Sequence, residues 1–170
     1  MEGIIYRENF LDNHESLFET LKNTIIWDER MLARKTASYG KAYNYSSMEY
    51  PFQPFTPNLK DIIESINSVL HFRPNNCLIN YYEDGNSSMG FHSDQIDILE
   101  KNTGVVIISI GEIRTLRFRN IKNRETIVDF NLVSGSLIYM TNEIQKEWQH
   151  SIPKSNIMNG RMSLTFRKLK

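Results

Sequence analysis

The chain has 170 residues, of which 40% are hydrophobic, 24% charged and 11% aromatic. These values are typical of one globular domain with room for a sizeable core, and they exclude a disordered or collagen-like chain. Twenty basic residues balance twenty acidic residues, so any binding of nucleic acid must use a local patch instead of bulk charge.

The single cysteine, Cys77, excludes an intramolecular disulfide and a cysteine-rich zinc cluster. A protein with so few thiols suits a reducing compartment. No apolar run approaches the roughly 20 residues of a membrane span, and the N-terminal sequence MEGIIYRENF lacks the pattern of a secretory signal. We therefore expect a cytoplasmic or nuclear protein with no membrane segment. No oligomer interface is visible in the sequence, and we expect a monomer.

The first half of the chain predicts two helices separated by irregular structure. Apolar residues at helical spacing predict a short helix over residues 14–23. Residues 28–58 combine many aromatic residues with glycine and proline, which indicates loops and hairpins. Thr56 is a suitable N-cap before Pro57, and the apolar periodicity that follows predicts a helix at about 57–70.

From residue 76 onward the pattern is mostly that of strands. Short segments rich in β-branched and aromatic residues alternate with turn residues such as Asp84-Gly85-Asn86 and Asn159-Gly160. Several closely spaced strands suggest a barrel or a sandwich. We therefore predict an α+β domain in which N-terminal helices support one sheet of a C-terminal β-barrel.

Three residues form a candidate metal site. His92 and Asp94 are two positions apart, and side chains at such positions on a strand point to the same side. His150 lies in another strand-like segment, far enough along the chain to return to the opposite wall of a barrel. Two histidines and one carboxylate match the facial triad of non-haem iron enzymes, which leaves coordination positions open. Zinc is the rival metal, and the triad alone does not distinguish the two.

The segment 161–167 is a candidate anion-binding strand. Alternate polar positions point to one side of it: Arg161, Ser163, Thr165 and Arg167. If that side faces a cavity, its two arginines require anions, and a small dicarboxylate beside a metal would satisfy them. Asn80 and Tyr82, which share one face of the strand INYYE, could complete the pocket. The competing interpretations are a solvated edge strand at 161–167 and ordinary core positions at Asn80 and Tyr82.

Taken together, these segments resemble the AlkB family of iron(II)- and 2-oxoglutarate-dependent dioxygenases. The matching sequence runs from LINYYEDGNSSMGFHSD through VVIISIGEIRTLRFR and GSLIYMTNEIQKEWQHSIP to GRMSLTFRKL, within residues 76–169. The order N-x-Y, H-x-D, H and R-x5-R is far more specific than any one of these pieces. The likeness is strongest to the branch that includes animal DNA-repair homologues.

The resemblance implies a double-stranded β-helix, or jelly roll, within one domain spanning 1–170. Residues 76–170 would form the catalytic jelly roll, and residues 1–75 the helices and a nucleotide-recognition lid. Fe(II) would be held by three residues: His92, Asp94 and His150. Arg161 would bind the distal carboxylate of 2-oxoglutarate. Arg167 would lie near the metal-chelating end, Asn80 and Tyr82 would be hydrogen-bonded to the cosubstrate, and Thr165 would face the same cavity. With O2, such enzymes form succinate and CO2, and an N-methyl base releases formaldehyde.

Residues that would bind an alkylated nucleic acid are predicted on the same basis. Tyr43 and Tyr45 lie where the family has its lid and would stack on a flipped base. Arg117 belongs to a basic run that could bind phosphate, although a solvated face is the alternative. Many repair members have an acidic residue where this chain has Ile96, and Asp97 could replace it. Ser163 also stands where asparagine is common.

Three functions therefore remain open at the level of sequence. The first is oxidative dealkylation of DNA or RNA bases. The second is the same chemistry on a protein side chain or a small metabolite, which Ile96 and the neutral charge keep open. The third is a non-catalytic nucleic-acid-binding module, although a binding role gives no reason to bury so much charge. A zinc hydrolase does not account for both arginines.

Overall fold

The structure is a computed structural model that describes residues 1–45 and 47–170, with Tyr45 described by its backbone alone. Over these residues the elements follow in this order: β1 (Ile4–Arg7), α1 (His14–Thr24), β2 (Lys35–Gly40), β3 (Tyr43–Tyr45), β4 (Met48–Tyr50), α2 (Pro57–Leu70), β5 (Asn76–Tyr82), β6 (Met89–His92), β7 (Val105–Gly111), β8 (Arg114–Asn120), β9 (Ile127–Leu132), β10 (Ser136–Met140), α3 (Asn142–Glu147), β11 (Trp148–Ile152) and β12 (Arg161–Arg167). No helix in the described part of the chain is both long and apolar enough to cross a bilayer.

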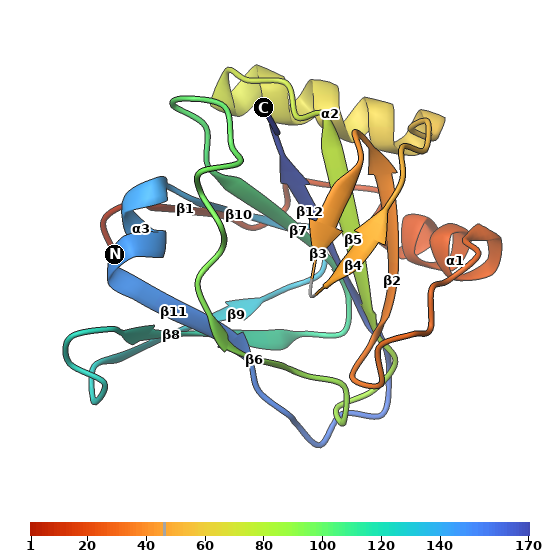
Figure 1. The fold of residues 1–170 in the computed structure, drawn as a ribbon. Coiled ribbons are helices and arrows are strands. Elements are labelled where there is room, and N and C mark those ends of the chain that lie inside the picture. The colour runs from red at the N-terminus through yellow and green to blue at the C-terminus, as the bar shows by residue number, and fades with distance from the viewer. Residues whose placement is uncertain (46) are drawn as a thin grey trace.

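Two antiparallel sheets form the body of the protein (Figure 1). The larger has the strand order β1-β10-β7-β12-β5-β2, and the smaller has the order β6-β11-β8-β9. An inner core lies between them, where Leu78 and Ile107 of the large sheet join Leu116, Phe118 and Ile152 of the small sheet. The α+β architecture predicted from the sequence is confirmed.

The two long helices cover the outer face of the large sheet (Figure 1). Leu21 of α1 and Ile66 of α2 belong to an outer core that also contains Ile79 and Leu164 of the sheet. Both helices were predicted within one residue of their observed bounds. The start of α2 follows from its cap, since the Thr56 hydroxyl accepts a hydrogen bond from the Leu59 backbone N–H at 3.4 Å.

The N-terminal region differs from its prediction, because it also supplies strands to the large sheet. β1 pairs with β10 and β2 pairs with β5. Residues 1–75 and 76–170 are therefore joined by continuous backbone hydrogen bonds as well as by helix packing. A four-residue strand such as β1 has too short a pattern to be recognised, and its partner is at least 130 residues away in the chain. The short helix α3 was also missed, because no element was predicted between the strand-like segments GSLIYMT and WQHSIP.

Candidate metal centre and cosubstrate pocket

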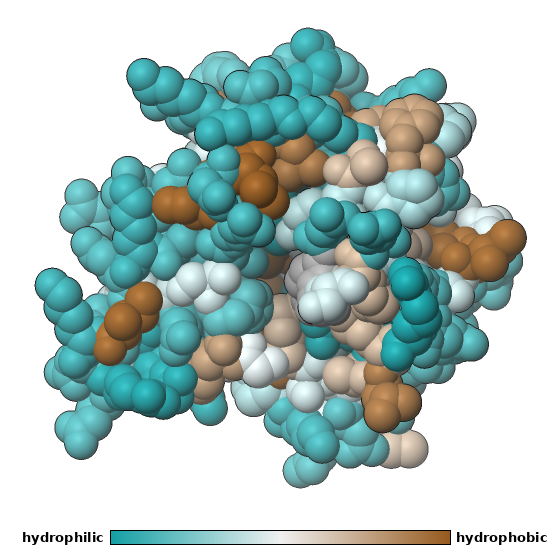
Figure 2. Space-filling view, viewed as in Figure 1, coloured by the Kyte–Doolittle hydropathy of each residue, from teal (hydrophilic) through white to brown (hydrophobic). Residues whose placement is uncertain are grey.

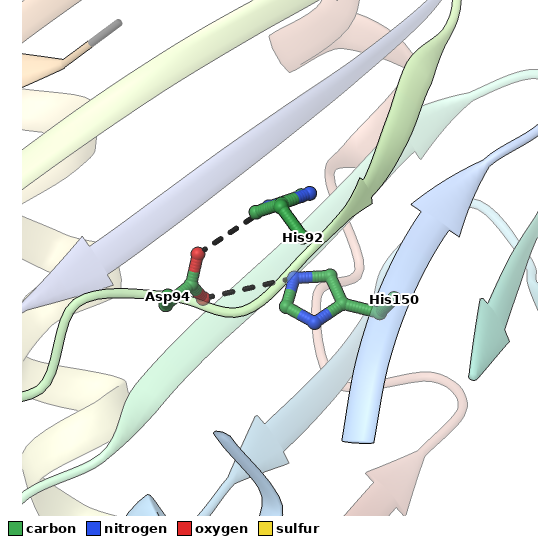
Figure 3. A group of neighbouring side chains, drawn as sticks. All are labelled: His92, Asp94 and His150. Atoms are coloured by element: carbon green, nitrogen blue, oxygen red, sulfur yellow. Dashed lines mark ion pairs between the residues drawn. The ribbon is translucent and has the colours of Figure 1, made fainter. Parts of the chain in front are cut away.

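The three side chains of the metal triad predicted from the sequence come together in the structure (Figure 3). His92 is the last residue of β6 and lies directly opposite His150 on β11 in the antiparallel register. Asp94 follows two residues after His92, beyond the end of the strand. The candidate ligand atoms of all three residues lie within 4.8 Å of one another. A transition metal can therefore meet both imidazoles and the carboxylate from one side.

The pKa shifts of two triad side chains, His150 and Asp94, favour the binding of a cation. Burial lowers the pKa of His150 to about 4, so its imidazole is neutral near pH 7. Burial alone would raise the pKa of Asp94, but the cationic groups around it outweigh that effect and hold the pKa well below its ordinary value. At His92 burial lowers the pKa, but the hydrogen bond and the charge of Asp94 outweigh burial, and the pKa is raised.

Hydrogen bonding also fixes the ring of His92. Its Nδ1 lies 2.8 Å from the Gly90 carbonyl oxygen, to which only a protonated Nδ1 can bond. Its Nε2 faces Asp94, with 3.5 Å between Nε2 and Oδ1. The Nε2 of His150 lies 3.7 Å from the second carboxylate oxygen, Oδ2. Each imidazole thus presents Nε2 to the point where the three side chains converge (Figure 3).

Strand β12 provides the anion-binding side of the same pocket. The predicted alternation is confirmed, since Arg161, Ser163, Thr165 and Arg167 line this pocket. The intervening apolar residues belong to the outer core: Met162, Leu164 and Phe166. The strand is central, with β5 on one side and β7 on the other. It is therefore not the solvated edge strand that was the alternative.

Arg161 is a buried cation with hydrogen-bonding capacity to spare. It is 1% exposed, and its Nη2 donates to the Ser109 hydroxyl at 2.8 Å. Its Nε and Nη1 find no hydrogen-bond acceptor among the described residues. Burial lowers the pKa of this guanidinium to about 10, so it remains charged at neutral pH. An anion in the pocket would supply the missing acceptors.

Arg167 lies at the metal end of the pocket. Its Nη2 is 3.5 Å from Asp94 Oδ1, and its guanidinium carbon is 5.0 Å from the centre of the Tyr43 ring. Its Nε and Nη1 also have no acceptor within the described part of the chain. The two ends of the pocket are therefore both cationic, with the metal triad beside Arg167.

Asn80 and Tyr82 of β5 line the pocket as predicted. They lie opposite Ser163 and Arg161 in the β5–β12 register. The sequence reading missed Arg34, whose Nε donates to Asn80 Oδ1 at 2.9 Å. This bond occupies the amide oxygen and leaves the amide nitrogen of Asn80 as the group that can donate into the pocket.

The basic run of β8 does not form one patch. Arg114 is buried and donates to three backbone carbonyl oxygens, those of Asp84, Ser87 and Pro153, so it ties two loops together. Arg117 alternates with the pocket-lining Leu116 and forms a two-point pair with Asp129, both N–O distances being 2.9 Å. The structure therefore places Arg117 on the outer face of the small sheet, away from the triad.

The predicted base-binding residues lie near the mouth of the site. Tyr43 is buried against Arg167, while Asp97 is exposed in a turn. Both line a depression that also includes Lys41, Ala42, Asn44, Gln95, Ile98, Leu169 and Lys170. Figure 2 shows this face hollowed between the β3–β4 hairpin and the segment that follows β6. Ile96 packs against the inner core instead. The side chain of Tyr45 lies outside the described residues.

Comparisons with known proteins agree with this geometry. Residues 8–167 match the family model of the 2OG-Fe(II) oxygenase superfamily. The chain is 31% identical over 147 residues to the human DNA oxidative demethylase ALKBH2, covering 80% of this chain and 56% of that protein. It is 29% identical over 180 residues to the mouse alpha-ketoglutarate-dependent dioxygenase alkB homolog 3, covering 93% of this chain and 63% of that protein.

Among solved structures, OsALKBH1 superposes with a TM-score of 0.69 at 18% identity, and the match covers 99% of both chains. This likeness concerns the fold alone. The chain spans between about half and three fifths of the length of the mammalian ALKBH2 proteins that it matches.

Proposed function

The chain belongs to the 2OG-Fe(II) oxygenase superfamily and, within it, to the AlkB family, and from this premise we propose that it removes alkyl groups oxidatively from nucleic acid bases. Family membership implies Fe(II), 2-oxoglutarate and a double-stranded β-helix. The observation that carries the proposal is the partly buried His92–Asp94–His150 triad beside two arginines with unused donors.

The residues present fit both groups. Two neutral imidazoles and a carboxylate are ligands that suit Fe(II) and leave adjacent coordination positions free. The guanidinium of Arg161 has unused donors on Nε and Nη1, and one carboxylate of 2-oxoglutarate can accept charge-assisted hydrogen bonds from it. When bound, the metal and cosubstrate supply the oxidation: O2 is consumed, 2-oxoglutarate is converted to succinate and CO2, and a substrate C–H bond is hydroxylated.

The other pocket residues orient the cosubstrate and exclude water. Arg161 would hold the distal carboxylate, and Arg167 would contact the end nearer to the triad. The amide nitrogen of Asn80 would donate to the same cosubstrate, because Arg34 already occupies the amide oxygen. Tyr82 and Thr165 would complete the polar lining. Apolar neighbours such as Leu78 and Ile107 keep the cavity dry, which strengthens these electrostatic contacts.

For the substrate, we propose an N-alkylated base of DNA or RNA that leaves its stack to enter the site. Tyr43 and Tyr45, on the β3–β4 hairpin that would act as the lid, would stack on the flipped base. Asp97, on the opposite side of the depression, would accept a hydrogen bond from the base edge. A methyl group hydroxylated on nitrogen leaves as formaldehyde, which restores the unmodified base.

The test is turnover of methylated oligonucleotides. With Fe(II), 2-oxoglutarate and O2, we expect formaldehyde and succinate in equal amounts, and no formaldehyde from the unmethylated oligonucleotide. Screening DNA and RNA, single- and double-stranded, would identify the preferred lesion. Slow succinate formation that no methylated base accelerates would contradict the nucleic acid assignment while leaving the dioxygenase chemistry intact.

The second candidate is a hydroxylase or demethylase of a protein side chain or a small metabolite. It is favoured by Ile96, which fills the usual acidic base-reading position and packs into the core. It is also favoured by the pairing of Arg117 with Asp129, which leaves less free positive charge for phosphate. Arg117 remains a proposed contact to a flanking phosphate only. If it makes that contact, Arg117→Ala will reduce the salt slope of oligonucleotide binding by about one.

A further inference from the structure

The proposed metal ligand Asp94 is hydrogen-bonded to a side chain that was not among the residues predicted for the site. Asp94 lies beyond the last residue of β6, so its backbone is outside the strand ladder that fixes His92 and His150 (Figure 3). Its N–H instead donates to Oε1 of Gln145 on α3 at 2.7 Å. We propose that Gln145 is a positioning residue for the metal site, and this inference rests on the proposed function.

The geometry assigns both ends of the Gln145 amide. Because a backbone N–H can only donate, the amide atom that faces it must be the oxygen. The amide nitrogen then points toward the carboxylate, with 3.4 Å between Nε2 and Asp94 Oδ2. The same nitrogen lies 3.8 Å from the sulfur of Met140. Gln145 therefore contacts the backbone and the side chain of Asp94 together, which restricts how the carboxylate turns.

Gln145 connects the loop that carries Asp94 to the part of the chain that carries His150. It is 5% exposed and lies on the short helix immediately before β11, five residues ahead of His150. A second bond reinforces the same junction, since the Ser93 hydroxyl donates to the Trp148 carbonyl at 2.9 Å. The loop that carries Asp94 is thus tied to the element that carries His150. Partners that orient metal ligands commonly contribute tenfold or more to metal affinity.

The test compares the full wild-type chain with Gln145→Met, which keeps the length of the side chain but removes both hydrogen-bonding groups. Mn(II) alone is the first probe, because it does not oxidise in air, and its affinity is measured from the EPR signal of free Mn(II). We expect the dissociation constant to rise about 10- to 100-fold. Co(II) is the second probe, and we expect its visible absorption to change because the carboxylate shifts relative to the imidazoles.

A matched control separates this role from general destabilisation. Ile66→Val removes one buried methyl group from α2 in the outer core, far from the triad. Thermal unfolding of the metal-free proteins reports the loss of stability in each variant. We expect Ile66→Val to keep wild-type Mn(II) affinity and the wild-type Co(II) spectrum. If Gln145→Met fails to fold, Gln145→Asn, which keeps an amide on a shorter stem, carries the same expectation.

The outcomes distinguish this inference from the proposed function. If the wild-type chain binds Mn(II) and the folded Gln145 variant binds it equally tightly with an unchanged Co(II) spectrum, the positioning role is overturned and the proposed function stands. If Ile66→Val weakens Mn(II) binding as much as Gln145→Met does, the effect is one of stability and the positioning role is again overturned. If the wild-type chain binds no Mn(II), the proposed function fails and the inference falls with it.

Discussion

Two regions of the protein meet at the metal triad and are built differently. The floor of the pocket consists of β5 and β12, which lie next to each other inside the six-stranded sheet and are buried at every position. The mouth consists of the β3–β4 hairpin, which forms a separate two-stranded sheet, and the exposed turn around Asp97. Substitutions in the floor should therefore affect the chemistry, whereas those at the mouth should affect which substrate is accepted.

Asp94→Ala should have the largest effect and tests the metal triad at which the two regions meet. Removing one of three protein ligands leaves the imidazoles unable to retain the metal, so we expect no measurable Mn(II) binding and no turnover. The matched control is Asp97→Ala, three residues along the chain at the mouth, which should keep Mn(II) binding. Turnover retained by Asp94→Ala would place the metal elsewhere.

Arg161→Met should have the next largest effect, and its two consequences should differ in sign. Loss of the buried partner for a carboxylate should weaken 2-oxoglutarate binding by about 2–5 kcal/mol, or roughly 30- to 5000-fold. The ligand-free protein should be as stable as the wild type or more stable, because a buried charge with unpaired donors is removed. Calorimetry with 2-oxoglutarate and thermal unfolding without ligand measure the two effects. A large loss of stability with unchanged 2-oxoglutarate affinity would make Arg161 a purely structural residue.

Tyr43→Ala probes the boundary between the two regions. A stacked base is worth about 1–3 kcal/mol, so oligonucleotide binding should weaken roughly 5- to 150-fold. Because the ring also packs on Arg167, we expect a smaller rise in the KM for 2-oxoglutarate in the same variant. Binding to a methylated oligonucleotide and substrate-free decay of 2-oxoglutarate should be measured together. Equal loss of both would mean that this ring serves the fold instead of the substrate.

Asp97→Asn should have the smallest effect and is confined to the mouth. The substitution keeps the shape but removes the charge, and it should change the preference among methylated bases by about 2- to 10-fold. Decay of 2-oxoglutarate without substrate should not change. The comparison of kcat/KM across methylated nucleosides measures this preference, and an identical ranking in both proteins would exclude Asp97 from base recognition.

The floor was predictable from the sequence because side chains alternate regularly between the two faces of a strand. Arg161 and Arg167 could be assigned to one face of a strand before any neighbour was known, and the structure places both in the pocket. The proximity of His92 and Asp94 was also predicted, but its stated cause holds only in part, since Asp94 lies beyond the strand. Gln145 gave no such signal, because its role depends on a loop 51 residues away in the chain.

The mouth was predictable only through family resemblance. Asp97 lies in a turn, where side-chain direction follows no fixed period, so the sequence did not show that Asp97 is exposed while Ile96 packs on the inner core. The basic residues of β8 show a second reason why sequence alone was insufficient. Its residues are close in sequence, but Arg114 is a buried tie between loops while Arg117 is paired on the outer face. Charge counted along a sequence does not show which charges remain free.

The most direct test is a crystal structure of the chain with Mn(II) and 2-oxoglutarate. We predict one metal ion bound by the Nε2 atoms of His92 and His150 and by the Asp94 carboxylate. We also predict 2-oxoglutarate with one carboxylate bound to the guanidinium of Arg161. A metal bound elsewhere, or a cosubstrate that leaves Arg161 without a carboxylate partner, would contradict the assignment of this pocket.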